Sequence, residues 1–433
     1  MKIAIIGAGI AGLAAAYDLH KAGCEVVVYE AADYVGGLAS GFKEPHWDWS
    51  VERYYHHWFA SDKHILGLME ELGLRSKVLF TRPVTAVYHE GDFYPLDSAL
   101  AVLRFPGLPF FDRIRMGMVV ALLKMLPDWR SLERVTADVW MRRWVGDRAY
   151  RSMWEPLLIG KFGDHYKDVN MAWMWARFKA RTPRLGTYQG GFQAFVEDLA
   201  AKLRELGVEI HLQTPVQKIE ALPAGGIRIS LQDGTTDVDQ CLATISPQLL
   251  SRLTPDMPSS YLNQLLSLKS MGAVVVVFAL KHRLSEKGVY WHNLPKDAGF
   301  PFLALVEHTN FLPAEHFGDE HIVYCGDYLD PEHAYFNLDQ NQLVEHFLPS
   351  MARINPAFTP DWVRKTWMFR TRYAQPVPGL EQSKVIPALR TPLPGLWFAS
   401  MSQVYPWDRG TNFAVQLARE AAAQILEEFF KER

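Results

Sequence analysis

A β-α-β unit is predicted by the first thirty residues, where two apolar runs flank a glycine turn and a helical segment. Lys2 to Ile6 is a run of short and branched apolar residues after one lysine, which is typical of a buried strand. Residues from about Ile10 to Ala22 predict a helix, and Glu25 to Glu30 predict a second strand. This order of elements is typical of a parallel α/β sheet.

Apolar patterning predicts further strands and helices along the chain. Residues 77–96 predict a hairpin that turns at Gly91-Asp92. Residues from Asp97 to about Arg181 have a mostly helical pattern and are rich in Trp, Met and Arg. We further expect helices over 193–206, 247–268, 338–353 and from about 412 to 430, and strands over 208–212, 215–222, 227–231, 241–245, 271–280, 302–307, 321–325 and 395–400.

The order of these elements predicts two domains. A chain of 433 residues is too long for one ordinary domain. Elements of the dinucleotide-binding type occur at the start, in the middle and at the end, so we expect residues 1–75, 186–246 and 376–433 to form one domain. The intervening segments, 76–185 and 247–375, are expected to form an inserted α+β domain that binds the substrate.

Composition and charge exclude several classes of protein. Hydrophobic residues make up 49% of the chain, so a large core is expected and extended disorder is not. The formal net charge of −3 gives no basic surplus, so we expect no nucleic-acid partner. Cys24, Cys241 and Cys325 show no metal-ligand spacing, which predicts no metal site and three reduced thiols in a cytoplasmic protein.

Two membrane-related alternatives are also not expected. No apolar stretch approaches the roughly 20 residues that a membrane span needs. The first sixteen residues are apolar, but their glycines have a regular spacing and a charged helix follows them, which argues against a signal peptide.

The first glycine turn has the spacing of a dinucleotide-binding fingerprint. Gly7-Ala8-Gly9-Ile10-Ala11-Gly12 matches GxGxxG and lies between a predicted strand and a predicted helix. The first glycine allows the tight turn, the second lets the backbone approach a pyrophosphate, and the third lets the helix pack on the strand. Glu30 ends the second strand, where a carboxylate accepts hydrogen bonds from ribose hydroxyls. This fingerprint alone fits either NAD or FAD.

The next ten residues distinguish these cofactors. Ala31-Ala32-Asp33-Tyr34-Val35-Gly36-Gly37-Leu38-Ala39-Ser40 resembles the second glycine motif of the FAD oxidoreductases of the amine oxidase superfamily, which includes protoporphyrinogen oxidases and phytoene desaturases. The resemblance implies FAD as the cofactor and a Rossmann-type FAD-binding domain of the p-hydroxybenzoate hydroxylase-like type, with an inserted α+β substrate domain. Family members often carry Arg where this chain has Leu38.

Later segments extend the resemblance over nearly the whole chain. Tyr188–Phe192 and Thr214–Ile219 are similar to the middle FAD segment of the family, and Gly395–Ser400 and Gly410–Ala414 to its final FAD motif. The last motif implies a helix start under the flavin pyrimidine ring, where the helix dipole favours negative charge. The cofactor contacts that the resemblance implies are Gly7, Gly9, Ile10, Ala11, Gly12, Glu30, Ala31, Gly36, Gly37, Leu38, Ala39, Val216, Met401, Asn412, Phe413 and Ala414.

Two departures from the family pattern bear on the reaction. Amine oxidases usually place a lysine near flavin N5, and none lies within Gly272–Val277. Thr411 stands where one tyrosine of an amine cage would be. Both departures favour the protoporphyrinogen oxidase-like and desaturase-like members, so we expect FAD-dependent oxidation of a small hydrophobic substrate by hydride transfer to flavin N5.

Three other functions stay open at this stage, the last of which is an amine or amino-acid oxidase with unusual side chains. The first is redox-neutral flavin catalysis, as in UDP-galactopyranose mutase-like or carotenoid isomerase-like enzymes. The second is a guanine-nucleotide dissociation inhibitor-like binding protein without FAD, against which the intact glycine fingerprint and Glu30 argue.

Two short segments supply candidate catalytic residues. In Glu52–Trp58, His56 or His57 is a candidate acid or base near neutral pH and Tyr55 a candidate proton donor. Adjacent residues of a strand point to opposite faces, so at most one histidine is expected to face the flavin. In Tyr405–Gly410, the residues expected to orient a substrate or close the site are Trp407, Asp408 and Arg409. The alternatives are a strand with core histidines and a loop ion pair or helix cap.

Weaker candidates concern substrate binding and membrane contact. Arg177, Arg181, Arg370, Arg372 and Tyr373 are candidates to bind a carboxylate or phosphate, or else form ordinary ion pairs. A Trp and Met cluster predicts either a pocket or core, and comprises Trp140, Trp144, Met153, Trp154, Trp173, Met174 and Trp175. Residues 103–126 combine aromatic and basic residues, which predicts either an interfacial helix on the inner face of a membrane or a buried helix. The oligomeric state stays open.

Overall fold

Five parallel strands form the sheet that carries the first glycine turn, and the computed structural model describes residues 1–96 and 98–431. The central strand β1 (Lys2–Ile6) pairs with β2 (Glu25–Tyr29) on one side and β14 (Gln240–Ala243) on the other. The edges are β10 (Glu209–His211) and β20 (Leu396–Phe398). The expected β-α-β start is confirmed, and strands from the start, middle and end of the chain share one sheet.

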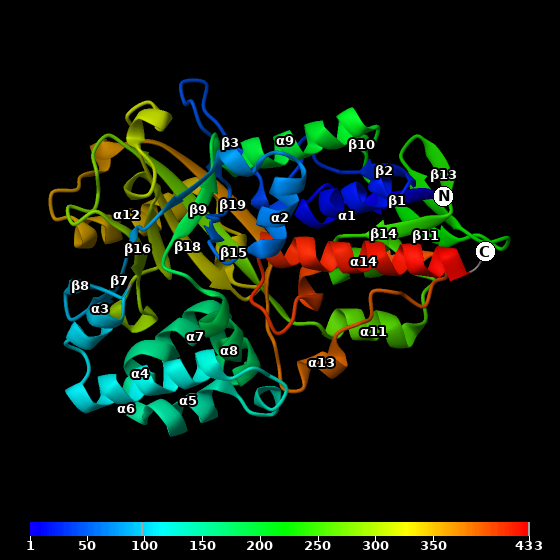
Figure 1. The fold of residues 1–433 in the computed structure, drawn as a ribbon. Helices are drawn as coiled ribbons and strands as arrows, with labels where there is room; N and C mark the ends of the chain where they lie inside the picture. The colour runs from blue at the N-terminus through cyan, green and yellow to red at the C-terminus, as the bar shows by residue number, and fades with distance from the viewer. Residues whose placement is uncertain (97, 432–433) are drawn as a thin grey trace.

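Both faces of this sheet are buried, which explains its continuous apolar strands. Ile3 and Ile5 of β1 face a core shared with α1 (Ile10–Lys21), α9 (Gly191–Leu206) and α14 (Thr411–Lys431). Alternate residues face a three-stranded antiparallel sheet made of β11 (Lys218–Ala221), β12 (Ile227–Leu231) and β13 (Gly234–Val238). Figure 1 shows this layered unit at one end of the molecule, close to both chain termini.

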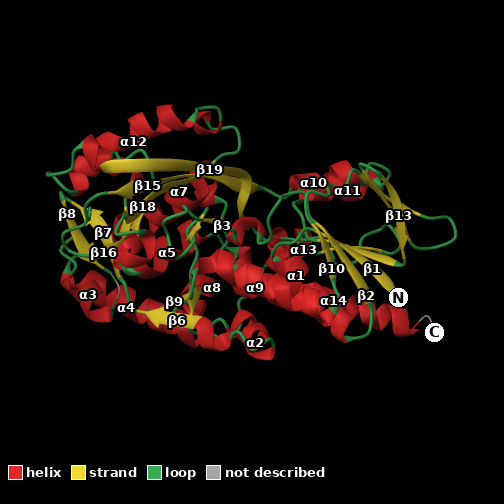
Figure 2. Cartoon of the chain, turned by 90° about the horizontal axis from the view of Figure 1, so that it is seen from above, coloured by secondary structure: helices red, strands yellow, loops and turns green. Residues whose placement is uncertain are grey.

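A seven-stranded sheet fills the other end of the molecule (Figures 1 and 2). Its order is β19 (Val363–Pro376), β15 (Ser270–Leu280), β18 (His321–Leu329), β17 (Ala304–Glu307), β16 (Val289–Asn293), β7 (Val84–His89) and β8 (Asp92–Pro95). Strand β15 is buried at every residue after Ser270. Helix α12 (Gln340–Ile354) packs on one face and begins with a capping box between Asp339 and Gln342.

A group of helices lies beside the large sheet and contains most of the predicted Trp and Met cluster. Its helices are α3 (Ala99–Arg104), α4 (Phe110–Met125), α5 (Ala137–Val145), α6 (Asp147–Ala149), α7 (Glu155–Phe162) and α8 (Met171–Ala180). Trp173, Met174 and Trp175 are buried in its core, whereas Trp144 is 45% exposed and stacks on Trp140. The cluster therefore serves mainly as core.

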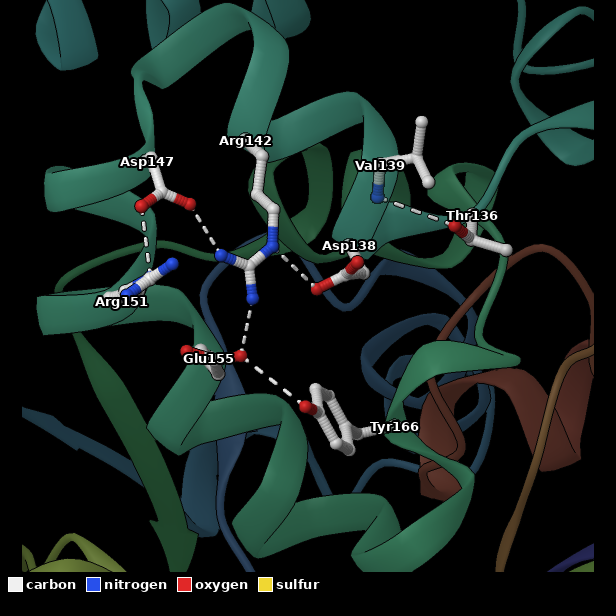
Figure 3. A network of polar contacts seen from close by, with 8 residues as sticks. All are labelled: Thr136, Asp138, Val139, Arg142, Asp147, Arg151, Glu155 and Tyr166. Carbon is white, nitrogen blue, oxygen red and sulfur yellow. Dashed lines mark hydrogen bonds and ion pairs between the residues drawn. The ribbon is translucent and has the colours of Figure 1, made fainter.

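One arginine ties three of these helices together (Figure 3). The Arg142 guanidinium donates to Asp138 at 3.0 Å, to Asp147 at 2.5 Å and to Glu155 at 2.6 Å. Glu155 is the first residue of α7 and also accepts from Tyr166. The network thus fixes the start of α7, the helix that carries Lys161 near its other end.

The remaining elements connect these layers. They are β3 (Gly41–Phe42), β4 (Val51–Glu52), β5 (Trp58–Phe59), α2 (Lys63–Glu71), β6 (Val78–Thr81), β9 (Leu185–Tyr188), α10 (Pro247–Leu253), α11 (Ser259–Ser267) and α13 (Gln382–Val385).

Some expectations from the sequence are wrong in detail. The expected hairpin over 77–96 is split, because β6 pairs with β9 while only β7 and β8 form the hairpin. Pro83, which has no N–H to donate, lies at the break. The segment from Glu52 to Trp58 is not one strand, since 53–57 form an irregular connection between β4 and β5. Strands β16 and β19 were not expected, and Asp97, where the helical pattern begins, lies outside the described residues.

Candidate active site

The first glycine turn forms an open cradle at the start of α1. A Cβ atom at Gly12 would lie 2.0 Å from the carbonyl oxygen of Gly7, so only glycine fits there. Gly7 has a φ of +105°, which permits the tight turn. In contrast, a Cβ at Gly9 would meet no atom within 4 Å, so the backbone at the helix N-terminus faces free space. Unpaired N–H groups at such a helix start suit a phosphate.

The acidic residue and the second glycine motif close around this cradle. The Glu30 carboxylate accepts hydrogen bonds from the amides of Ala8 at 2.8 Å and Ala32 at 2.9 Å. The Gly36 amide donates to the Ala8 carbonyl at 2.8 Å, and Gly37 follows with a φ of +56°. Thr214 donates its amide to the Glu30 carbonyl, which brings the segment of Val216 to the same loop. The predicted cofactor residues of the first 40 positions therefore lie together.

Two side chains at the start of α14 form hydrogen bonds with the segment that contains β5 and α2. Thr411 accepts from the Trp58 indole at 2.9 Å, and Asn412 accepts from the amides of His64 at 2.8 Å and Ile65 at 3.2 Å. The Asn412 side chain therefore caps α2 through its Oδ1 atom. Phe413 stacks on Trp407 with 5.2 Å between ring centroids.

The other predicted residues of this region take different positions. Ile10 is buried at the start of α1, and Ala39 is buried after the second glycine motif. Ala11 and Ala414 lie in the first turns of α1 and α14, whereas Ala31 and Met401 follow β2 and β20. All four are partly or fully accessible. Met401 begins a short 3-10 turn that is capped by Ser400, with a capping box to Gln403.

A pocket lies between this unit and the large sheet. It is lined by Leu38, Tyr54, Tyr55, His56, Ala273, Val275, Asp327, Tyr328, Thr371, Ala374 and Arg409. Leu38 belongs to the second glycine motif, whereas Ala273 and Val275 belong to β15. The lining is mainly apolar and aromatic, which suits an apolar ligand.

The pKa values of the two histidines lie well below the near-neutral values expected from the sequence. Burial lowers the pKa of His56 to about 4, and burial together with Arg181 lowers the pKa of His57 to about 3. Both rings are therefore neutral near pH 7 and are poor proton donors there. His56 contacts the Tyr54 carbonyl through Nδ1 at 2.5 Å, whereas Nδ1 of His57 is buried without a partner.

Asp408 is the centre of a partly buried group of cations. Its carboxylate accepts from Lys161 at 2.7 Å, from Arg177 at 3.2 Å and from the Trp173 indole at 3.2 Å. Although burial raises it, the positive charges of Lys161, Arg177 and Arg409 hold the pKa of Asp408 well below its usual range. The Arg409 side chain lines the pocket and donates a hydrogen bond to the Tyr328 hydroxyl.

With this geometry established, comparison with known proteins identifies the family. A model of the flavin containing amine oxidoreductases matches residues 10–426. The chain belongs to this family. The predicted α/β fold with a Rossmann-type FAD-binding domain is confirmed, FAD is the cofactor, and the protein is a flavin-dependent oxidoreductase.

Relatives of this flavoprotein include desaturases and oxidases. A probable zeta-carotene desaturase of Synechococcus elongatus is 21% identical over 99% of each chain. A crystal structure of a putative protoporphyrinogen oxidase from Exiguobacterium has a TM-score of 0.77 at 19% identity, covering 99% of each chain. Reduced UDP-galactopyranose mutase has a TM-score of 0.75 at 16% identity, covering 98% of this chain and 95% of its own. These structural likenesses establish the shared fold.

The residues around Gly9 and Glu30 fit FAD, because open space at the backbone, a helix start and a carboxylate lie together. Leu38 extends from this cradle into the pocket beside Tyr55 and Arg409. The candidate substrate pocket therefore borders the cofactor motif.

Two functional candidates were missed in the sequence. Lys161 is a lone charged residue within the apolar run Leu157–Phe162, which is the one local signal for it. Tyr328 follows Asp327 on β18, and nothing in that strand's pattern distinguishes it. Asp327 itself forms an ion pair with Lys296.

The weaker arginine candidates separate into two groups. Arg177 and Arg181 lie near the pocket, one turn apart at the end of α8. Arg370 donates to the carbonyls of Phe336 and Leu338, and Arg372 to that of Pro331, so both hold a loop beside β19. The Tyr373 hydroxyl contacts Ser400 at 2.7 Å and Ser402 at 2.8 Å. These last three residues have structural partners away from the pocket lining.

Proposed function

We propose that this flavoprotein oxidises a largely apolar substrate by removing a hydride from a C–H bond. The observation that carries the proposal is the pocket, in which Leu38 of the FAD motif faces the apolar residues Ala273 and Val275 of β15. Its remaining wall includes Tyr54, Tyr55 and Tyr328, whose rings bind flat or extended apolar groups well.

The side chains around the pocket favour hydride removal over amine chemistry. Strand β15 carries no lysine among Ser270–Leu280. His56 is neutral near pH 7 and a weak base, and Tyr55 has its pKa raised well above its usual value, chiefly by burial. A mechanism that needs a strong base in the pocket is therefore not supported, whereas hydride removal needs none.

When bound, FAD supplies the acceptor for that hydride at its N5 atom. The chain contributes the rest: the glycine cradle and Glu30 hold the cofactor, and Tyr55 and Tyr328 orient the substrate. A proton left on the oxidised product passes to solvent, and the electrons pass to oxygen or another acceptor.

Anaerobic mixing tests this proposal. FAD-loaded protein would be mixed with polyprenyl, polyene and porphyrinogen compounds, and the flavin absorption followed. Bleaching by one class supports oxidation of that class. Failure of every class to bleach the flavin, with turnover only after reduction by dithionite, would instead support a redox-neutral reaction.

The redox-neutral alternative has one specific observation in its favour. Arg177 and Arg181 lie close to the pocket, as would suit the phosphates of a nucleotide sugar. Arg370 and Tyr373, the other residues considered for that role, do not support it because they are bonded elsewhere.

We also propose peripheral contact with a bilayer through residues 103–126. Helix α4 buries Met116, Val119 and Leu123, while its opposite side exposes an apolar row. That row consists of Phe110 (59% exposed), Phe111 (81%), Ile114 (38%), Met118 (62%), Leu122 (49%) and Met125 (79%). Lys124 is exposed on the same helix and suits anionic lipid headgroups, whereas Arg115 donates to the carbonyls of Arg143 and Trp144. Among the described residues, no helix is long and apolar enough to span a membrane.

A further inference from the structure

We propose that Arg181 and Arg409, backed by Lys161 and Arg177, bind an oxyanion group of the substrate, a carboxylate or a phosphate. This inference rests on the proposed substrate pocket and adds a chemical class to it: the substrate is amphipathic, with an apolar body and an anionic end. The four cations are called the cation cluster below.

The cation cluster has a surplus of positive charge. Lys161, Arg177 and Arg409 each act on Asp408, which is the one carboxylate paired with the cluster among the described residues. The nearby Asp327 is paired with Lys296 instead. Four positively charged side chains beside one carboxylate repel one another, and a further anion would relieve that repulsion.

Two of the cations are held and two are available. Lys161 and Arg177 share one oxygen of Asp408, at 2.7 and 3.2 Å, and their side chains are only 11% and 12% exposed. Arg181, by contrast, makes no hydrogen bond or ion pair with the described residues, and its guanidinium lies 5.7 Å from the Phe59 ring centroid. In Arg409, the Nε atom is buried without a partner.

The two available cations differ in exposure, since Arg181 is exposed and Arg409 is half-buried. Burial, together with the charge of Arg177, lowers the pKa of Arg181 to about 9. The Arg181 side chain is exposed, so a ligand can reach its guanidinium. An arginine in such a place is well suited to bidentate binding of a carboxylate or phosphate.

The cation cluster adjoins the apolar pocket. Arg409 lines the pocket and donates to the hydroxyl of Tyr328, another lining residue. Lys161 lies 5.8 Å from the centroid of the same tyrosine ring. A substrate can therefore place its apolar part beside Leu38 and Val275 while its anionic end meets the cations.

The cluster is separate from the FAD phosphate cradle. The cradle is built by the first glycine turn and Glu30, whereas the cations come from α7, α8 and the residues before α14. Loss of Arg181 should therefore leave FAD binding intact.

Anion titration of the FAD-loaded protein tests the inference. The probes are inorganic phosphate, inorganic pyrophosphate and decanoate, added at constant ionic strength against chloride and followed by calorimetry and by flavin difference spectra. We expect saturable binding of at least one probe. Arg181→Gln should weaken it about tenfold or more, since a charge-assisted hydrogen bond is worth about 1.5–3 kcal/mol. Preference for pyrophosphate would indicate a phosphorylated substrate, and preference for decanoate a carboxylate.

Arg184→Gln is the matched control, because Arg184 is exposed three residues further on and contacts the Phe80 ring. Absence of saturable binding by all three probes would overturn the inference, and so would equal affinities of the two variants. The flavin-to-protein ratio and dithionite bleaching are measured on the same samples. A reducible holoprotein that binds no anion refutes this inference alone, whereas anion binding through Arg181 without reduction by any substrate refutes the proposed oxidation alone.

Discussion

The Lys161 ammonium donates to the Asp408 carboxylate across 2.7 Å, and the two residues lie 247 positions apart in the chain. Burial lowers the pKa of Lys161, while Asp408 opposes that effect. The pair joins α7 of the helical group to the segment that leads into α14, and so connects the substrate side of the molecule to the cofactor side.

Asp408→Asn should destabilise the protein strongly. The change leaves Lys161 and Arg177 without their shared carboxylate at low exposure, and breaking such a pair costs about 3 kcal/mol or more. Urea unfolding measures the loss in free energy of unfolding. As a control, Asp237→Asn removes an exposed pair with Arg228 and should have a much smaller effect. Equal losses in the two variants would show that the Asp408 group is not held as described.

The same carboxylate gives a directional prediction for acid stability. Its native pKa lies well below the unfolded value of about 4, so its stabilising contribution is complete above that pH. The contribution is lost only as the pH falls through the native pKa. The difference in unfolding free energy between wild type and Asp408→Asn should therefore stay constant from about pH 5 to 8.

His57 should make stability rise with pH in the mildly acidic range. Its native pKa of about 3 lies below the unfolded value of about 6.5, so between these values the unfolded chain binds more protons. We expect a contribution of roughly 1 kcal/mol per pH unit between about pH 4 and 6, which fades to none above about pH 7.5. Urea unfolding across this range should show a shallower slope for His57→Gln, while His211→Gln, at an exposed position, should keep the wild-type slope. Parallel slopes for all three proteins would contradict the burial of His57.

Those parts of the site whose residues lie close together in the chain could be predicted from the sequence, whereas contacts between distant segments could not. The turn at Gly7–Gly12 and the acid at Glu30 belong to one β-α-β unit, so spacing alone places them together. The contact of Lys161 with Asp408 joins distant segments and leaves no spacing pattern. Strand β19 was missed because its charged residues, such as Arg370 and Arg372, interrupt the apolar signal. Their partners are loop carbonyls that only the folded chain supplies.

Asn412→Ala should lower stability without abolishing FAD binding. The side chain accepts two amide hydrogen bonds at the start of α2, and loss of such a cap costs about 1–2 kcal/mol. Thermal and urea unfolding of the FAD-loaded protein would measure the loss. Asn412→Asp keeps an acceptor oxygen at the same place and should recover most of the stability. A variant of normal stability that loses its flavin would instead indicate a direct cofactor role for the side chain.

Glu30→Ala should weaken FAD retention. The carboxylate organises the amides of Ala8 and Ala32, and it is the group placed to accept from ribose hydroxyls. We expect an affinity for FAD roughly tenfold lower or worse, measured by flavin fluorescence on titration of the apoprotein. Glu25→Ala, at the exposed start of the same strand, serves as the control. An unchanged affinity in Glu30→Ala would remove this residue from the cofactor site.

Membrane contact through α4 is testable with two exposed phenylalanines. Phe110 and Phe111 are 59% and 81% exposed at the start of the helix, so replacing both with serine removes apolar surface without disturbing the core. Each buried phenylalanine is worth about 1.5–3 kcal/mol, so binding to vesicles should weaken by at least about tenfold in the double variant. Cosedimentation with vesicles of mixed anionic and zwitterionic lipid measures this. Phe430→Ser, at an exposed position near the end of α14, should bind like wild type. If the double variant binds vesicles as tightly as wild type, or if wild type does not bind them, the exposed row on α4 is not a bilayer contact.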